Sequence, residues 1–560
     1  MKRSLRTSHA RRAATAALAL VVCGGIVVVN VSTGSAAARA SGPARKMIII
    51  LRDQNLGLAP RSAARNAAVS REQAPILKSL VESGATDISS LTVMNALVAR
   101  MSAAEARRLA ANPAVAHVLS NAVISGPTAT SHPASSELGA KVVHEPTSKV
   151  TVNGLCGSAH DPQLNPEALT NINATPTELG TNDGAGVTVA FLADGLDPSD
   201  TDFQRNVAYG TPDQPVVRQY DFSSDGTNAP TQGNEAFGDA SSIAAQGNAV
   251  YDLSQYVSSA HPLPSGCDIK IVGAAPGANV EALKVFATDN DTTESGILEA
   301  INFAVASGAK VINESFASTS FPDTALDVTR EANDAAVAAG VTVVVSAGDA
   351  GGASTIGSPA ADPNVISVGA TTTFRAYTQL TYGGINDPNA SGAYVDNNIS
   401  SLSSGGYTQG GNTVDLVAPG DLNWALCSPN RLYASCYNES YAGSPIQLFG
   451  GTSESAPFVA AAAADLISAY ASTHNGQDPT PTLVKEILMS TATDVGAPAT
   501  EQGAGLLNVL AAVKEAKAVD GGGDTTSSKS SGGGLLLNPG QINVVEGPDA
   551  TTNRSVQVTN

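Results

Sequence analysis

Basic residues are scarce in most of this 560-residue chain, which carries 31 Lys and Arg against 50 Asp and Glu. The two signs are unevenly divided: residues 1–125 hold 16 basic and five acidic residues, and the remainder holds 15 and 45. Because proteins bind polyanions mainly through Lys and Arg, the acidic part argues against nucleic acid as a partner. It favours solubility in acidic or saline surroundings instead.

Apolar runs long enough to suggest a membrane segment are absent apart from one, at about residues 13–31. That run follows several basic residues and precedes the small residues of Ser35-Ala-Ala-Ala-Arg-Ala40, which is the pattern of a secretory signal over 1–40. A retained membrane anchor is the alternative, because the run is long for a signal. We expect a secreted, extracellular protein that has no membrane contact once the signal is removed.

Cysteine is also sparse, and no Cys-x-x-Cys or His-rich spacing indicates zinc. Cys23 lies in the predicted signal. The other four cysteines form an even set, which predicts disulfides in an exported chain. We expect the local pair Cys427 and Cys436, which leaves Cys156 to pair with Cys267.

Short apolar runs alternate with helical stretches through most of the chain. Residues 46–125 read as a compact basic α+β unit. From about residue 187, β-branched runs between helices predict an α/β fold with a mostly parallel sheet, whose ligand site lies at the carboxyl ends of the strands. The expected divisions are a signal at 1–40, the small unit at 46–125, a processing segment or N-terminal extension at 126–160, the main domain at 161–519, a Gly/Ser linker at 520–534 and the start of a possible β-sandwich at 535–560.

One stretch, Phe449-Gly-Gly-Thr-Ser-Glu-Ser-Ala-Pro457, joins a glycine turn to a long apolar run that continues to Tyr470. Since Pro457 is tolerated in a first helical turn, we expect a buried helix that begins within a residue or two of Ser453. Free N–H groups and the positive end of the helix dipole would then lie near the Ser453 hydroxyl. The ordinary alternative is a Thr-Ser pair that only caps a helix. The string Gly-Thr-Ser-x-Ser-Ala-Pro resembles the nucleophile motif shared by the subtilisin and sedolisin families of serine peptidases.

Further segments between about 171 and 519 resemble the subtilisin scaffold and follow its order. The resemblance implies a subtilisin-like fold and an endopeptidase that cuts proteins or peptides through an acyl-enzyme on Ser453. It also implies that residues 46–125 form an inhibitor prodomain, which blocks the cleft until its removal. The segments are Gly273-Ala-Ala-Pro-Gly-Ala278, Gly308-Ala-Lys-Val-Ile-Asn-Glu-Ser-Phe316, Pro359-Ala-Ala-Asp-Pro-Asn-Val-Ile366, Asp415-Leu-Val-Ala-Pro-Gly420 and Gly503-Ala-Gly-Leu-Leu-Asn508.

Three positions depart from the subtilisin pattern. Ala193 stands where the family has the Asp that ends the first strand, and Asp194 comes one residue late, on the opposite face of a strand. The family's His-Gly-Thr helix is missing. Asp349 replaces an Asn in Ser346-Ala-Gly-Asp-Ala-Gly351.

A carboxylate set fills these gaps. Glu235 and Asp239 would share one face of a helix and could share a proton. Together with Asp349 they resemble the catalytic set of the sedolisin, or serine-carboxyl, peptidases. The resemblance implies that Ser453 is the nucleophile, Glu235 the general base and acid, Asp239 its orienting partner and Asp349 the oxyanion stabiliser. Burial and like charge raise carboxyl pKa values, so activity is expected in acid.

Three alternatives stay open at this point. Alignment on the neighbouring residues would make Asp239, rather than Glu235, the direct base. Loss of the family's His and Asp could instead leave an inactive peptidase fold that serves as a binding or surface module. No cofactor is required by this chemistry, and calcium is left open, because Asp494 resembles a sedolisin calcium ligand whereas the later expected Asp is Glu501.

Overall fold

The computed structural model describes most of the chain between residues 43 and 519 and three short segments beyond it. The predicted signal at 1–40, the linker at 520–534, most of the 126–160 segment and most of 535–560 lie outside the described residues. The described ranges are 43–55, 57–58, 61–126, 155–225, 234–257, 262–317, 320, 322, 326–380, 396–430, 432–433, 436, 443–519, 536–538, 541 and 555–559.

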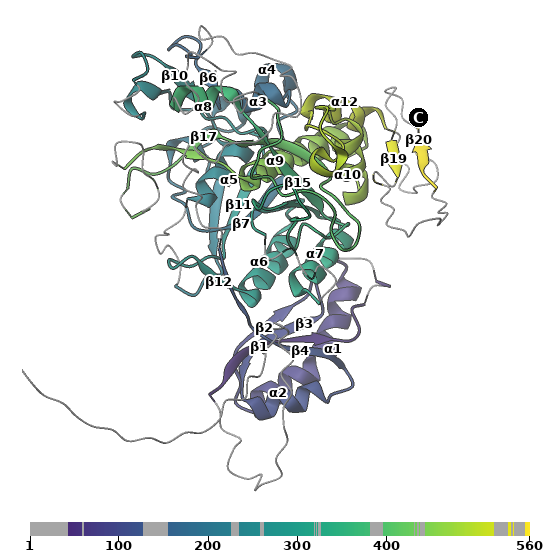
Figure 1. Ribbon diagram of the computed structural model, residues 1–560. Helices are drawn as coiled ribbons and strands as arrows, with labels where there is room; N and C mark the ends of the chain where they lie inside the picture. The colour runs from purple at the N-terminus through teal and green to yellow at the C-terminus, as the bar shows by residue number, and fades with distance from the viewer. Residues whose placement is uncertain are drawn as a thin grey trace, which may run out of the picture. The chain divides into compact units, whose positions relative to one another are not determined.

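The main domain is built on a seven-stranded sheet in the order β16-β15-β14-β13-β7-β11-β8, in which every neighbouring pair is parallel. This confirms the predicted α/β class. Figure 1 labels β7, β11 and β15 of this sheet. Parallel strands place their carboxyl ends along one edge, where a site can form. The strands are β7 (Thr188–Ala193), β8 (Val217–Asp221), β11 (Asn279–Lys284), β13 (Val311–Glu314), β14 (Thr342–Ser346), β15 (Ile366–Thr372) and β16 (Leu416–Asp421).

Helices cover both faces of this sheet, and the strands are apolar on both sides for that reason. On β7, Val189 and Phe191 join one core cluster, whereas Ala190 and Leu192 join the other. α9 lies on the first face against five strands, β7 and β13 to β16, and packs on α5 and α12. The principal helices are α5 (Glu235–Ala244), α6 (Glu294–Ser307), α7 (Val328–Ala338), α9 (Thr452–Thr473), α10 (Pro481–Ser490) and α12 (Val509–Ala518).

A small α+β unit precedes the main domain, as the alternation of residues 46–125 predicts. Its antiparallel sheet has the order β2-β3-β1-β4. Ile49 and Leu51 face a core formed with α1, and Ile48 and Ile50, on the opposite face, belong to the same core cluster as residues of α6 and α7. The elements are β1 (Arg45–Leu51), α1 (Ala63–Glu82), β2 (Thr86–Leu91), β3 (Ala96–Met101), α2 (Ala103–Ala110) and β4 (Val115–Ser120).

Shorter elements complete the described chain. Within its described part, no helix is both long and apolar enough to cross a bilayer. The shorter elements are β5 (Val123–Ser125), β6 (Gln163–Leu164), α3 (Ala168–Asn171), α4 (Pro176–Leu179), β9 (Tyr251–Asp252), β10 (Asp268–Lys270), β12 (Asp291–Thr293), α8 (Phe374–Leu380), β17 (Asn423–Leu426), β18 (Ile446–Phe449), α11 (Ala499–Gln502), β19 (Leu536–Asn538) and β20 (Gln557–Thr559), with 3-10 turns at Thr201–Phe203, Val207–Tyr209 and Leu253–Gln255.

Both predicted disulfides are confirmed. Cys156 pairs with Cys267, and Cys427 pairs with Cys436. The second bridge lies beside the hairpin of β17 and β18, which contacts α5. Paired cysteines of this kind persist in oxidising compartments, which agrees with the predicted export.

Candidate active site

Ser453 is the second residue of α9, so its hydroxyl lies at the positive end of a buried helix. The predicted start of the helix is correct, but Pro457 is the sixth helical residue and not part of the first turn. A proline there leaves the carbonyl of the residue four positions earlier, Ser453, without its helical donor. The Ser315 hydroxyl donates to that carbonyl oxygen at 3.1 Å. Pro457 and Ser315 together fix the main chain of the nucleophile candidate.

Asp349 lies against the residues that precede Ser453. Its Oδ1 accepts hydrogen bonds from the Thr452 amide and the Thr452 hydroxyl, each at 2.8 Å. Gly451 has a φ of 106°, and a Cβ there would lie 2.5 Å from Asp349 Oδ2. Only glycine allows this approach of backbone and carboxyl group. Burial raises the pKa of Asp349, its bonds with Thr452 act in the opposite direction, and the Asp421 carboxylate raises it further.

Glu235 and Asp239 both lie on α5, one helical turn apart, as predicted. Burial raises the pKa of Glu235 well above its ordinary value, and the Asp239 and Asp194 carboxylates raise it further. The nearby Ser453 hydroxyl opposes this rise. The Ser453 Oγ also lies 3.1 Å from the Ser315 carbonyl oxygen. One hydroxyl proton serves one acceptor well at a time, so Glu235 and this carbonyl are alternative acceptors for Ser453.

Asp239 is completely buried and is held by two polar residues at the end of β13. Its Oδ1 lies 2.7 Å from the Ser315 hydroxyl and 3.4 Å from the Asn313 amide nitrogen. Burial raises the pKa of Asp239 well above its ordinary value, more than these two partners lower it. A protonated Asp239 can donate to the Ser315 hydroxyl, which frees that hydroxyl to donate to the Ser453 carbonyl. The acid pair is thereby linked to the nucleophile's main chain.

Asp194 is the site residue that sequence reasoning placed wrongly. We expected its side chain on the opposite face of β7, but β7 ends at Ala193, so strand alternation no longer fixes the direction of Asp194. Its Oδ1 accepts from the Ala236 amide at 2.8 Å, in the first turn of α5. Its charge contributes to the raised pKa of Glu235 and Asp239. The sequence did offer one signal for Asp194. It is a carboxylate one residue after a strand, and the Asp that subtilisins have at the end of this strand is missing.

Ser315 was also missed, although it lies in the quoted segment Gly308-Ala-Lys-Val-Ile-Asn-Glu-Ser-Phe316. A serine after a strand carries no chemical signature of its own, and its role depends on contacts with α5 and α9. The same holds for Glu454, the residue after Ser453, which is 1% exposed. Polar side chains of this kind become meaningful only when the fold brings their partners to them.

The glycine in the middle of α5 has a steric cause. Gly238 would reduce the stability of an isolated helix, yet a Cβ at this position would lie 2.1 Å from the Phe449 ring. α5 therefore packs closely on β18. Glycine lowers the helix propensity at this position, but it allows α5, which carries the two acids, to lie close to β18, which leads into the Ser453 turn.

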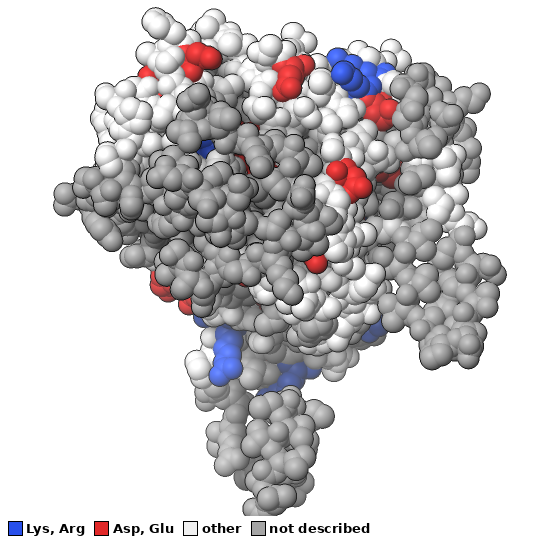
Figure 2. Space-filling model, turned by 45° about the horizontal axis from the view of Figure 1, so that its top comes forward, with Lys and Arg blue, Asp and Glu red and all other residues white. Residues whose placement is uncertain are grey.

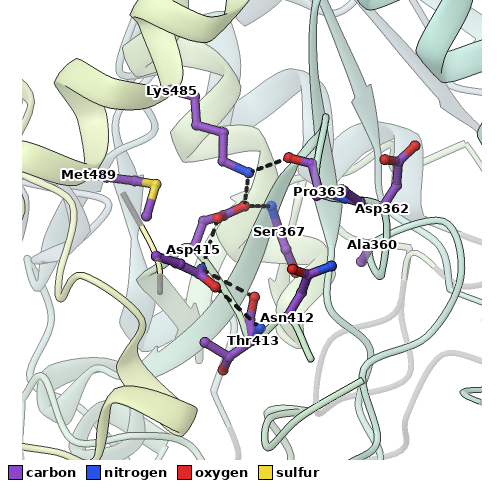
Figure 3. Close-up of a pocket in the computed structure, with 10 residues that line it drawn as sticks. Ala360, Asp362, Pro363, Ser367, Asn412, Thr413, Asp415, Lys485 and Met489 are labelled. Atoms are coloured by element: carbon purple, nitrogen blue, oxygen red, sulfur yellow. Dashed lines mark hydrogen bonds and ion pairs between the residues drawn. The ribbon is translucent and has the colours of Figure 1, made fainter. Parts of the chain in front are cut away.

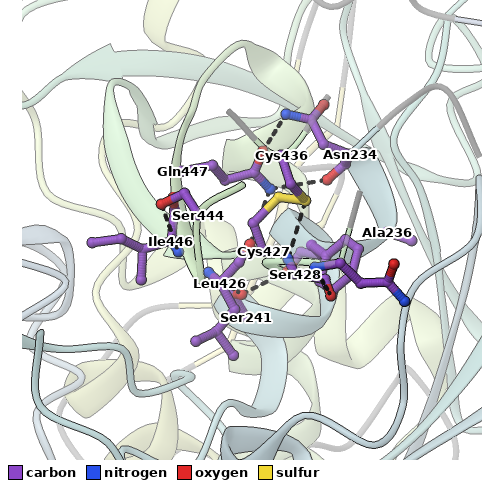
Figure 4. The surroundings of a disulfide bond; sticks show 12 residues. Asn234, Ala236, Ser241, Leu426, Cys427, Ser428, Cys436, Ser444, Ile446 and Gln447 are labelled. Atoms are coloured by element: carbon purple, nitrogen blue, oxygen red, sulfur yellow. Dashed lines mark hydrogen bonds between the residues drawn. A yellow bond between two sulfur atoms is a disulfide. The ribbon is translucent and has the colours of Figure 1, made fainter. Parts of the chain in front are cut away.

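The hairpin beside the second disulfide holds the start of α5 (Figure 4). Gln447 donates to the carbonyl oxygens of Asn234 and Leu426, at 3.1 and 3.0 Å, and the Leu426 amide donates to Ser241 at 2.9 Å. Asn234 immediately precedes Glu235. The contacts of β17 and β18 therefore position the first residue of the acid pair.

The described histidines do not supply a base for Ser453. His474 follows the last residue of α9, and at about 1.5 Å per residue a helix of this length places it roughly 30 Å from Ser453. His117 belongs to β4 of the N-terminal unit, and His160 is exposed near Cys156. His261 lies outside the described residues.

Asp494, the candidate calcium residue, is engaged by N–H donors of its own loop. Asp494 Oδ1 accepts from the Gly496 amide at 2.7 Å and from Gln502 Nε2 at 2.8 Å, so N–H donors occupy the oxygen that a cation would need. Across the described residues, no group of three or more His, Cys, Asp or Glu side chains is arranged to hold a metal.

A pocket of about 160 Å³ lies away from Ser453, and its polar groups bind one another (Figure 3). Lys485 Nζ lies 2.8 Å from Asp415 Oδ2 and donates to the Pro363 carbonyl at 2.9 Å. Gln541, which follows the predicted linker, donates to Asp415 Oδ1 at 3.0 Å. The pocket therefore receives a residue of the C-terminal segment and contains none of the predicted catalytic groups.

Acidic residues are scattered over the face drawn in Figure 2 and do not gather into one patch. The acidic groups that do gather are the buried ones around Ser453. Glu235, Asp239 and Asp349 come from two separate parts of the fold, and the structure brings all three to the N-terminus of α9. The arrangement can accept a proton from the Ser453 hydroxyl and can place a second carboxyl group beside the same serine.

Known proteins match this chain over the main domain. Residues 184–506, more than half of the chain, match the Subtilase family, peptidase S8. Subtilisin DY of Bacillus licheniformis is 31% identical over 247 residues, which cover 44% of this chain and 71% of that protein. Subtilisin E of Bacillus subtilis (strain 168) is 28% identical over 353 residues, 62% of this chain and 71% of that protein.

A solved structure agrees in fold. The crystal structure of fervidolysin from Fervidobacterium pennivorans, described as a keratinolytic enzyme related to subtilisin, matches with a TM-score of 0.55 and 18% identity. The match covers 86% of this chain and 62% of that one, so this chain spans less than two thirds of fervidolysin. With the sequence matches over residues 184–506, these findings mean that the chain belongs to the subtilase family of serine peptidases.

Proposed function

We propose that this protein is an exported endopeptidase in which Ser453 is activated by the Glu235 and Asp239 pair, and that it works best in acid. The observation that carries the proposal is that the buried Glu235 carboxyl group lies close to the Ser453 hydroxyl, in a site where a second buried acid, Asp239, supports the first. In such a pair one group can hold a proton while the other accepts one.

The proposed reaction begins when Ser453 Oγ attacks the carbonyl carbon of the scissile peptide bond and its proton moves to Glu235. The carbonyl oxygen becomes an oxyanion near the N-terminus of α9, where the helix dipole and a protonated Asp349 stabilise it. The C–N bond then breaks, and Glu235 returns the proton to the leaving amine. Water attacks the ester on Ser453 with Glu235 as the base, which releases the acid product and restores the serine.

The proposed pH range follows from two groups with raised pKa values: Asp349 sets its upper limit and Glu235 its lower limit. Asp349 can donate a hydrogen bond to the oxyanion only while it is protonated, and burial favours that form. Glu235 must lose its proton to act as a base, and burial with like-charged neighbours keeps its pKa above that of an ordinary carboxyl group. Activity is therefore proposed to fall as pH rises and Asp349 ionises.

The N-terminal α+β unit is proposed to be an intramolecular inhibitor. β5, at the end of that unit, pairs in antiparallel fashion with β12, which immediately precedes α6. Asn302 on α6 accepts from the amides of Thr92 and Val93, at 2.7 and 3.1 Å. These contacts support an association that must be broken, or cut within 123–160, before a protein substrate can be processed.

Covalent labelling tests the proposal. A fluorophosphonate probe should label Ser453 fastest at acidic pH once residues 46–125 have been removed, and peptide mapping should locate the probe on this residue. Ser453→Ala should abolish both labelling and turnover, with residual turnover below about one thousandth of the parent rate. The matched control is Ser472→Ala, at the other end of α9, which should label and turn over like the parent.

Each other outcome has a distinct meaning. Labelling no faster than that of an ordinary exposed serine at every pH would favour a binding module on a peptidase scaffold. Labelling that increases through pH 6 to 8 would instead implicate a histidine such as His261 and contradict the carboxylate base.

A further inference from the structure

Glu454 follows the nucleophile candidate directly and is one of the most deeply buried carboxyl groups near it. It lies in the first turn of α9 and is 1% exposed. Its Oε1 accepts from the Ser242 hydroxyl of α5 at 2.9 Å, and its Oε2 is buried without a hydrogen-bond partner. The side chain therefore bridges the two helices that carry Ser453 and the acid pair.

The surroundings of Glu454 favour an uncharged acid. Buried carboxylates are costly unless a cation or several donors compensate for the loss of water. The groups that act on Glu454 are Ser242 and Asp239 of α5 and Asn423 at the start of β17, and the charged one is another acid. Burial and the Asp239 carboxylate raise the pKa of Glu454 well above its ordinary value, against the hydrogen bond from Ser242 and the nearby polar side chain of Asn423.

The Ser242–Glu454 hydrogen bond affects the relative positions of Ser453 and the acid pair. Ser242 lies one helical turn after Asp239 on α5, and Glu454 adjoins Ser453 on α9. The Ser242–Glu454 contact therefore sets how far along α9 the nucleophile lies relative to the acids. The Ser315 contacts with Asp239 and with the Ser453 carbonyl set the same relation from β13. Two polar ties hold the serine and its acid pair in register.

We propose that Glu454 is a positioning residue of this site, and that as an uncharged acid it ties the nucleophile's helix α9 to the acid-bearing helix α5 through Ser242. This inference rests on the proposed function, and it adds a residue that the serine-carboxyl set does not contain. Ionisation of Glu454 would place a negative charge beside Asp239 and would leave that charge without a cation. The tie should therefore weaken as pH rises.

Two substitutions at this position separate the tie from bulk packing. Glu454→Leu fills the space but cannot accept from Ser242, and kcat should fall by about 10- to 100-fold with KM changed less than about threefold, because small displacements of reacting groups cost rates of this order. Glu454→Gln keeps an oxygen for Ser242 and cannot ionise. It should restore most of the kcat lost in the leucine variant, and the fall of kcat at higher pH should begin at a higher pH than in the parent.

A matched control and a coupling measurement complete the design. Glu486→Gln makes the same chemical change on α10 and should leave kcat and its pH dependence unchanged. Ser242→Ala removes the other end of the tie, so Glu454→Leu in that background should cost little further kcat. Additive losses in the double variant would contradict a shared tie.

Thermal unfolding supplies a readout that does not need turnover. A buried acid with a raised pKa keeps its proton when folded and loses it when unfolded, so it destabilises the fold increasingly as pH rises above about 4.5. The Tm of Glu454→Gln relative to the parent should therefore increase from pH 4 to pH 7. A difference that does not depend on pH, or a leucine variant with the parent's kcat, would overturn the inference. A parent that neither labels nor turns over would overturn the catalytic role, while the Tm series would still decide whether Glu454 is uncharged.

Discussion

Asp349 accepts two hydrogen bonds from Thr452 on one oxygen, and this contact places its other oxygen against Gly451, next to the nucleophile candidate. If catalysis requires the hydrogen bond that protonated Asp349 donates, the side-chain amide of Asn should supply the same bond, since Asn donates without titrating. Asp349→Asn should lose less activity at pH 7 than at pH 4, and should extend the pH profile of kcat/KM upward. At neutral pH the parent should lack this donor, a loss typically worth about 100- to 1000-fold in rate.

The measurement is kcat/KM from pH 3 to pH 8 on one peptide substrate for the parent, Asp349→Asn and Asp349→Ala. Asp349→Ala should be slow at every pH, because it removes the donor in both forms. An Asn variant whose profile has the parent's shape would show that protonation of Asp349 does not limit the reaction.

At the residue scale, the sequence was sufficient where a motif fixes neighbours along the chain. Ser453, and the spacing of Glu235 and Asp239, are local patterns, and the structure brings them to the same helix terminus. Asp194 and Ser315 could not be predicted, because their partners lie 42 and 138 positions away. A side chain past the end of a strand has no periodicity from which to read its direction.

At the element scale, α5 departs from local propensity at Gly238. An alanine there would favour an isolated helix by about 1 kcal/mol, but its Cβ would lie within 2.1 to 2.5 Å of three Phe449 ring atoms. We expect Gly238→Ala to lower Tm and to reduce kcat, because α5 must move away from β18 and carry the acid pair with it. Overpacking of this kind typically costs 1–3 kcal/mol.

A second substitution, at Phe449, tests whether the steric clash is the cause of these effects. Phe449→Leu should relieve the clash, so Gly238→Ala should be less harmful in that background than in the parent, as measured by Tm and kcat together. If Gly238→Ala raises Tm and leaves kcat unchanged, propensity outweighs packing at this position and the steric explanation is wrong.

Strands buried on both faces were predicted well, whereas two strands at sheet edges were missed. The runs that form β7, β13 and β14 are continuous and β-branched, as expected for strands covered by helices. β8 and β2 were missed, and both lie at sheet edges, where they are mostly half-exposed and polar. α1 begins at Ala63, in a stretch whose side chains are mostly exposed, and continues through Pro75. Edge strands and helix starts carry weaker apolar patterns because less of their surface is buried.

At the scale of the whole molecule, the acidic composition has a consequence that counting charges does not reveal. Several carboxyl groups of the main domain are buried without a cation, among them Asp465, whose two oxygens have no hydrogen-bond partner. Burial raises the pKa of Asp465 well above its ordinary value, and the Asp183 carboxylate raises it further. Surface acids favour solubility, whereas buried acids make the fold depend on the protons that they keep. Which acids are buried could not be predicted, because a helix such as α9 that is apolar all round gives no sign that its Asp465 faces the core.

The dependence of stability on the protons that buried acids keep can be tested at Glu314. This residue ends β13, is completely buried, and accepts from the Asn333 amide at 2.8 Å. Burial raises the pKa of Glu314 to about 8, with smaller contributions from Asp327 and Asp362. The folded state therefore keeps a proton that the unfolded chain releases above about pH 4.5. By linkage, this single group reduces the stability of the fold as pH rises from about 4.5 to 8, by up to about 5 kcal/mol over that range.

Glu314→Gln should remove this dependence, since the amide oxygen still accepts from Asn333 and nothing ionises. Its Tm should be close to the parent's at pH 4 and should exceed it by a growing margin toward pH 8. The matched control is Glu82→Gln on α1, where the side chain is 66% exposed and the Tm difference should stay near zero throughout. A Glu314→Gln variant that is less stable than the parent at pH 8 would mean that the glutamate is ionised and compensated in the fold. In that case Glu314 would contribute to stability at neutral pH, and its burial would not make the fold less stable as pH rises.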